Sequence, residues 1–181
     1  MLNEEQNLIF EKYKKGENVF LTGPGGTGKS FLIKKIVKDA EENERIIQVC
    51  ALTGCASILL NCKAITLHRF AGIGLANKPI PVILEELLKK KYKLKKWFKL
   101  QCLIIDEVSM MSLKILLLLD AIAKKIYNNL NIPFGGLQVI FSGDFYQLPP
   151  VMSQDDDEKE SSMFCFEHPL WYQLFPPENQ M

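Results

Sequence analysis

Hydrophobic positions along the chain fall into two alternating patterns, short continuous apolar runs and longer helical repeats. The continuous runs predict strands at residues 18–23, 46–53, 101–107 and 137–144. Helical spacing predicts one helix at residues 3–14 and another from the glycine-rich turn to about residue 42. Ser112 is expected to cap a third helix, whose apolar positions recur at steps of three and four residues: Ile115, Leu118, Leu119, Ile122, Ile126 and Leu130.

Strands that are apolar on both faces and are each followed by a helix indicate a parallel sheet covered by helices on both sides. The expected fold class is therefore α/β. In such sheets, ligands bind beyond the carboxyl ends of the strands. Gly23, Asp106 and Asp144 each lie at or just beyond such an end, and Gln147 follows closely, so these residues can face one site.

Composition narrows the class of protein. A chain of 181 residues that is 48% hydrophobic and 24% charged is typical of one globular domain. The net charge is +1, so any affinity for nucleic acid must come from a local patch. Five cysteines without a C-x-x-C pair argue against a disulfide framework and a zinc site and favour a reducing, intracellular compartment, nuclear or cytoplasmic. We expect no targeting segment and no membrane helix.

The strongest motif is GPGGTGKS at residues 23–30, which matches the phosphate loop G-x-x-x-x-G-K-[ST] between a predicted strand and a predicted helix. Its glycines allow backbone N–H groups to converge on phosphate oxygens, beside the positive end of the helix. Lys29 would reach the terminal phosphates and Ser30 would bind Mg²⁺. The alternative is a glycine-rich turn with an incidental lysine.

Two further motifs supply polar groups at strand ends. Asp106 and Glu107 end the strand CLIIDE, where one carboxylate can hold the metal and the other can orient or deprotonate the attacking water. Gln147, in GDFYQLPPV, can hydrogen-bond the terminal phosphate or that water. The alternatives are an acid pair that caps a strand and a loop glutamine that faces solvent.

Together these motifs resemble the Pif-type, RecD-like branch (superfamily 1B) of ATP-dependent DNA helicases. Besides the phosphate loop, the resemblance rests on LNEEQ, ALTGCASILL, AITLHRFAGIG, IIDEVSMMS, GDFYQLPPV and FCFEHPLW, in this order. It implies the first RecA-like motor domain, with ATP and Mg²⁺ as ligands and roles in DNA repair, recombination and telomere maintenance. The residues implied to bind the nucleotide are Gln6, as the amide that reads adenine, and Gly23, Gly25, Gly26, Thr27, Gly28, Lys29 and Ser30.

The resemblance also implies a path for single-stranded DNA along Thr53, Gly54, Thr66 and His68, with 5′-to-3′ movement. Without a DNA role, Thr53 and Gly54 would form a plain strand-to-helix turn and His68 would be a core or turn histidine. Gln6 could likewise be an exposed helical glutamine. Helicases of this superfamily have a second motor domain that supplies further arginines, and this chain has room for the first domain alone.

The expected domain layout is a motor domain over residues 1–152, an acidic loop at 153–163 and a segment at 164–181 that leads towards the second motor domain. Within the first unit, residues 79–99 look like an insertion, whose end holds seven lysines interleaved with Tyr92, Trp97 and Phe98. This run either binds a nucleic-acid strand or is a solvated helix with Trp97 and Phe98 docked on the core.

The sequence leaves two alternative functions. A small kinase needs arginines over the phosphates, and the chain has Arg45 and Arg69 alone. A non-catalytic nucleotide-binding module that interacts with another protein is the second alternative. The sequence does not define the oligomeric state or a preference for DNA over RNA.

Overall fold

The computed structural model describes residues 2–150 and 159–181, and its centre is a five-stranded parallel sheet. The strands lie side by side in the order β1-β5-β4-β2-β3. Their bounds are β1 Val19–Leu21, β2 Ile47–Ala51, β3 Ile65–Thr66, β4 Cys102–Asp106 and β5 Gln138–Ser142. All the pairs are parallel, so every carboxyl end lies at the same edge.

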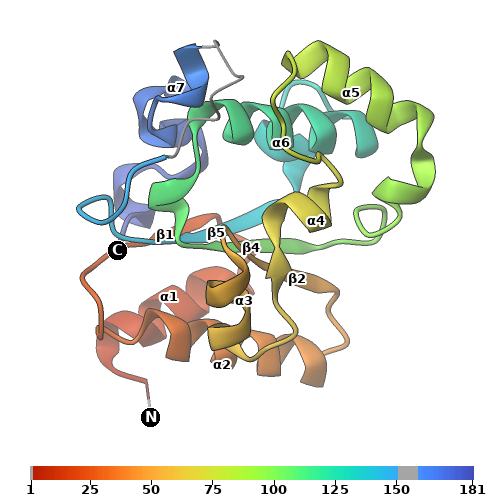
Figure 1. Ribbon diagram of the computed structural model, residues 1–181. Helices are drawn as coiled ribbons and strands as arrows, with labels where there is room; N and C mark the ends of the chain where they lie inside the picture. Colours follow the sequence, from red (N-terminus) through yellow and green to blue (C-terminus); the bar gives the residue numbers. More distant parts are fainter. Residues whose placement is uncertain (1, 151–158) are drawn as a thin grey trace.

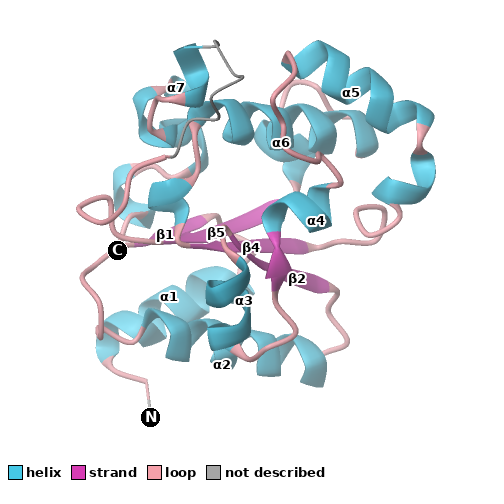
Figure 2. Ribbon diagram, viewed as in Figure 1, coloured by secondary structure: helices cyan, strands magenta, loops and turns pink. Residues whose placement is uncertain are grey.

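Helices cover both faces of this sheet (Figures 1 and 2). On the lower face in Figure 1 lie α1 Glu4–Lys14, α2 Lys29–Glu42 and α3 Gly54–Leu60. On the upper face lie α4 Leu67–Ala71, α5 Ile80–Lys89, α6 Leu113–Ile126 and α7 Pro169–Leu174. Short 3₁₀ turns complete the described part: η1 Lys91–Leu94, η2 Val108–Met110, η3 Pro133–Gly136, η4 Lys159–Ser161, η5 Cys165–Glu167 and η6 Pro177–Asn179.

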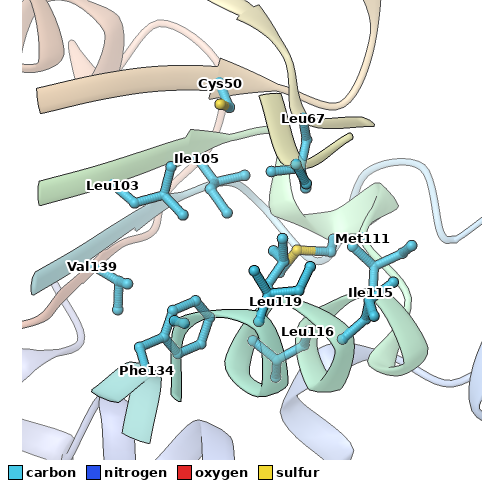
Figure 3. Packing of buried hydrophobic residues seen from close by; sticks show 14 of the residues in the cluster. Cys50, Leu67, Leu103, Ile105, Met111, Ile115, Leu116, Leu119, Phe134 and Val139 are labelled. Carbon is cyan, nitrogen blue, oxygen red and sulfur yellow. The ribbon is translucent and has the colours of Figure 1, made fainter. Parts of the chain in front are cut away.

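Alternation along the strands divides the interior into two hydrophobic clusters, one on each face. In β4, Leu103 and Ile105 belong to the cluster under α6, whereas Cys102 and Ile104 pack against α1 and α2. Figure 3 shows Leu103 and Ile105 on the same side as Leu119 of α6. Because strand side chains alternate, a strand that is buried on both faces is apolar at most positions. The predicted α/β class, a parallel sheet with helices on both faces, is therefore confirmed.

The four predicted strands and the three predicted helices are all present, with one error at a boundary. Leu130 was expected to belong to the third helix, but α6 ends at Ile126 and Leu130 is 60% exposed. The chain leaves the helix through Asn128, whose φ is 51°. Asparagine adopts this left-handed conformation more readily than other residues with side chains, which stops the helix despite the continuing apolar spacing.

The segment at 79–99 is helical in its first half and irregular in its second. Leu94, Trp97 and Leu100 are buried at every third position. The Trp97 ring lies on Phe70, with 4.7 Å between ring centroids. Phe98 is 55% exposed, so the alternative in which both aromatic rings dock on the core holds for Trp97 and not for Phe98.

Residues 159–181 pack against the same core as α6. Trp171 of α7 contacts Phe20 of β1 edge to face at 4.9 Å, and Gln180 forms a parallel bridge with Phe20. The first part of the acidic loop lies outside the described residues, and the role of 164–181 as a lead into a second motor domain stays a prediction. Among the described helices, none is long and apolar enough to cross a membrane.

Candidate nucleotide site

The phosphate loop connects β1 to α2, and its backbone takes conformations that need glycine. Gly28, immediately before α2, has φ of 92°, in the left-handed region. A Cβ at this position would also lie 2.6 Å from Nε2 of Gln6. The left-handed turn into the helix therefore favours glycine at position 28, and a larger residue there would also displace the Gln6 amide.

Lys29 begins α2 and turns back over the loop. Its Nζ donates hydrogen bonds to the carbonyl oxygens of Gly23 and Pro24, at 2.5 and 3.0 Å. Thr27 Oγ1 also donates to the Pro24 carbonyl, at 2.9 Å. The loop is thus held by hydrogen bonds from its own side chains, and the ammonium group lies against two of its carbonyl oxygens.

The three predicted motifs meet in one cavity of about 270 Å³ at the carboxyl edge. It is lined by Gly25, Gly26, Gly28, Lys29, Ser30, Asp106, Glu107, Gly143, Asp144 and Gln147. The loop after β1 faces the ends of β4 and β5 here because all three strands are parallel neighbours. Hydroxyl and carboxylate oxygens are the ligands that Mg²⁺ prefers, so this donor set fits that ion.

Glu107 has both an unusual backbone conformation and a shifted side-chain pKa. Its φ and ψ are 60° and 41°, a left-handed conformation that is costly for a residue with a side chain. Burial raises the pKa of the Glu107 carboxyl, and the nearby Asp106 and Asp144 raise it further, whereas Lys29 lowers it. Strain combined with a raised pKa at a cavity is typical of a group that takes up a proton during a reaction.

Close packing fixes the acid pair against the glutamine motif. A Cβ on Gly143 would lie 3.0 Å from the backbone nitrogen of Val108, so no larger residue fits between the two loops without a shift. Asp144 then organises its own turn. Its Oδ1 accepts from the Tyr146 backbone N–H at 3.0 Å, and its Oδ2 lies 3.4 Å from Gln147 Nε2.

Gln6 lies in a second cavity, which shares Gly28 and Lys29 with the first and also has a volume of about 270 Å³. Its walls are mainly apolar, with Ile9, Leu21 and Leu32 among the lining residues. Gln6 also completes a capping box, in which its Oε1 accepts from the Asn3 N–H at 3.1 Å. Gln6 is half-buried beside the loop, which argues against the alternative of an exposed helical glutamine, and its contact with adenine stays a prediction.

The four residues predicted to contact DNA lie further along the same edge. Strand register aligns Asp106 with Ala51 and Ala51 with Thr66, so the ends of β4, β2 and β3 form a row. Thr53 caps α3, since its Oγ1 accepts from the Ala56 N–H at 3.2 Å, and Gly54 is the first residue of that helix. Burial lowers the pKa of His68, which is therefore neutral at pH 7. Their contact with DNA stays a prediction.

Sequence reasoning placed Asp144 at this edge without a chemical role, and it did not single out the lining residues Asn3 and Thr22. Asp144 had a usable signal, because it follows a buried strand as Asp106 ends one. Asn3 and Thr22 had none, since they reach the site through the packing of α1 on α2 and through the end of β1.

A phosphate loop opening α2, an acid pair ending the neighbouring β4 and a glutamine beyond β5 define a RecA-like P-loop protein with a nucleotide site. Comparison with known proteins gives the family. A sequence profile described as PIF1-like helicase matches residues 1–176, and the chain therefore belongs to the PIF1-like helicase family.

Individual relatives agree with this assignment. The chain is 38% identical over 172 residues to the Saccharomyces cerevisiae ATP-dependent DNA helicase PIF1, covering 94% of this chain and 19% of that protein. Against the human ATP-dependent DNA helicase PIF1, the identity is 35%, with 97% of this chain and 26% of that protein covered. This chain thus spans about a fifth to a quarter of the length of these relatives.

Solved structures match over the same region. A crystal structure of the Candida albicans Pif1 helicase superimposes with a TM-score of 0.83 at 36% identity, covering 96% of this chain and 38% of that one. The Bacteroides Pif1 helicase, in complex with ADP-AlF3 and single-stranded DNA, gives a TM-score of 0.71 at 33% identity, with coverages of 96% and 40%.

The raised pKa of Glu107 predicts a pH-dependent effect on stability. A carboxyl whose pKa is raised by folding is harder to ionise in the folded state than in the unfolded state. The free energy of unfolding therefore decreases as the pH rises above the pKa of this carboxyl in the unfolded state. Glu107→Gln should therefore stabilise the domain at pH 7 and have less effect near pH 4, as measured by urea unfolding at both pH values.

Glu44→Gln is the matched control, because Glu44 has a similar backbone φ of 53° and an exposed side chain. It should change stability little at either pH. A Glu107→Gln variant that is less stable than the parent at pH 7 would show that the ionised carboxylate is stabilised by its surroundings.

Proposed function

We propose that this chain is the ATP-binding motor domain of a DNA helicase that couples ATP hydrolysis to 5′-to-3′ movement along single-stranded DNA. The observation that supports this most directly is the single cavity in which Lys29, Glu107 and Gln147 meet. The family relatives are named as ATP-dependent DNA helicases, and one relative was solved with a transition-state analogue and single-stranded DNA. The complete reaction is expected to need a second motor domain.

In this proposal the nucleotide phosphates bind the N–H groups of residues 25–30, at the positive end of α2. The Lys29 ammonium exchanges its loop carbonyl partners for phosphate oxygens. Ser30 and Asp106 would hold Mg²⁺, which would neutralise phosphate charge. Adenine would enter the apolar cavity beside Ile9 and Leu32, where Gln6 can pair with its edge.

Glu107 is the proposed base. Its raised pKa favours uptake of a proton from the attacking water, and its backbone conformation fixes the direction of the carboxylate. Gln147 is the proposed sensor of the terminal phosphate, held near Asp144. Asp106 of β4 is aligned through β2 with Thr66 of β3, so one strand separates the proposed metal site from the proposed DNA path.

The two arginines are poorly placed to stabilise charge on the transferring phosphate. Arg45 precedes β2 at the amino edge, where it donates to the Gln138 side chain at 2.6 Å and lies over the Tyr13 ring. Arg69 is exposed on α4, on the side of the proposed DNA path. An arginine finger is typically worth about 10³ to 10⁵ in turnover, so the isolated domain should hydrolyse ATP slowly.

Replacement of Lys29 tests the phosphate site. Lys29→Ala should weaken binding of a fluorescent Mg-ATP analogue by about 100-fold or more, because a charge-assisted contact with phosphate is lost. Lys34→Ala removes an exposed lysine from the same helix and should bind normally. Equal affinity in the two variants would remove the phosphate-loop assignment.

Replacement of Gln6 tests the adenine site. Gln6→Ala should reduce the preference for ATP over GTP by roughly tenfold, because two hydrogen bonds to the base are lost. Since this change also breaks the capping box, Asn3→Ala serves as the control, for it removes the cap and keeps the amide. A loss of preference in Asn3→Ala equal to that in Gln6→Ala would assign the effect to the helix terminus.

Steady-state phosphate release tests the arginine argument. The 181-residue chain should bind ATP, hydrolyse it very slowly with or without single-stranded DNA, and unwind no duplex. The residual rate should fall further in Glu107→Gln. Robust DNA-stimulated turnover that is lost in Glu107→Gln would show that an arginine acts within this chain or from a second copy.

A further inference from the structure

The seven lysines at residues 89–99, here called the lysine ridge, have no part in the nucleotide site. They are Lys89, Lys90, Lys91, Lys93, Lys95, Lys96 and Lys99, and all are exposed. Lys89 pairs with Glu85 at 2.6 Å. Within residues 2–150 and 159–181, no ion pair is formed by the other six.

The charge of the lysine ridge contrasts with that of the rest of the chain. The whole chain has a formal net charge of +1, and the ridge contributes seven positive charges and no negative ones, so the remaining residues are net negative by six. Like charges at this density repel one another and destabilise the fold unless an anion lies near them. A surface that carries both lysines and acidic residues, as α2 does, would avoid this repulsion.

The ridge is also fixed in place. Every third residue is buried in the core, namely Leu94, Trp97 and, directly after the ridge, Leu100. The Tyr127 hydroxyl donates to the carbonyl oxygens of Trp97 and Leu100, at 2.6 and 3.1 Å. The lysines are therefore presented from a rigid support, which lowers the entropy lost when they bind a partner.

Two exposed aromatic rings lie among the lysines. Tyr92 is 66% exposed and Phe98 is 55% exposed, whereas Trp97, which lies between them in the sequence, is fully buried. At one end, Lys90 and Lys93 line a cavity of about 300 Å³ beside the loop that joins α4 to α5. Cationic side chains with free aromatic rings are the combination that binds single strands, through phosphate contacts and base stacking.

We propose that the lysine ridge is a second contact surface for single-stranded nucleic acid, separate from the path along Thr53, Gly54, Thr66 and His68. It lies between α5 and the amino end of β4, whereas the path follows the carboxyl ends of β2 and β3. The exposed rings favour nucleic acid over an acidic protein, which would need the lysines alone. The choice of partner class rests on the proposed function.

The test compares two triple variants that lose equal charge. Lys90→Gln/Lys91→Gln/Lys93→Gln changes the ridge, whereas Lys15→Gln/Lys34→Gln/Lys35→Gln changes exposed lysines of the other sheet face that pair with no described residue. Anisotropy of labelled oligo-dT is measured over a range of low salt concentrations. Each lost phosphate contact should lower the magnitude of the slope of log affinity against log salt by about 0.7, so the ridge variant, which loses three lysines, should show a slope smaller by about 2. The control variant should keep the parental slope.

A third variant, Tyr92→Ala/Phe98→Ala, tests stacking. It should bind oligo-dT roughly tenfold more weakly with an unchanged salt slope. Equal binding by the ridge and control variants would overturn the proposal. So would binding of poly-glutamate that depends on the ridge lysines but not on the two rings, because this result would assign the surface to an acidic protein.

Mg-ATP binding, measured on the same variants, separates this inference from the proposed function. The ridge variants should bind the fluorescent ATP analogue as the parent does. If the ridge substitutions leave oligo-dT binding unchanged while ATP binding is normal, only the proposal of a second surface is overturned. Absence of ATP binding in the parent chain would remove the proposed motor function, whatever the ridge does.

Discussion

Parallel pairing of β1, β5, β4 and β2 is the constraint on which the other features depend. Because these strands run in one direction, whatever follows each strand arrives at the same edge. The phosphate loop, the acid pair and the glutamine motif are more than a hundred residues apart from first to last, and the sheet brings them to one cavity. Burial on both faces also explains why these strands are largely apolar.

The edge is stabilised by the core behind it and contains unfavourable local states. Glu107 has a left-handed backbone and a carboxyl whose pKa is raised by burial. A Cβ on Gly143 would press on the Val108 backbone, and one on Gly28 would displace the Gln6 amide. A strained conformation persists when the surrounding packing leaves no alternative, and here two hydrophobic clusters supply that packing. The chemistry of the site thus depends on residues that never contact a ligand.

Charge is distributed unevenly between the two edges of the sheet. At the carboxyl edge, Asp106, Glu107 and Asp144 face one lysine across the cavity. At the amino edge, Arg45 is held by Gln138 and Tyr13 in a structural role. Six lysines that form no ion pair with a described residue lie on the lysine ridge, between α5 and the amino end of β4. The proposed phosphate site and the proposed second surface for nucleic acid are therefore different surfaces, so each can be altered by substitution without direct damage to the other.

The sequence by itself determined the α/β class, the order of the strands along the chain and the motifs at their ends. These features depend on residues close to one another in the chain, such as the spacing of the phosphate loop or the Ser112 cap of α6, confirmed by its contact with Ile115. The family resemblance rested on the same local patterns and is confirmed by the match over residues 1–176.

Tertiary structure decided which side chains meet. The contact of Gln6 with Gly28, the burial of Trp97 beside an exposed Phe98 and the fixing of Arg45 at the amino edge all depend on packing between distant segments. Apolar spacing continued to Leu130, yet the turn at Asn128 ended α6. Local pattern specifies the elements, whereas long-range packing sets the position of each side chain, because the free energy of burial depends on neighbours that lie elsewhere in the sequence.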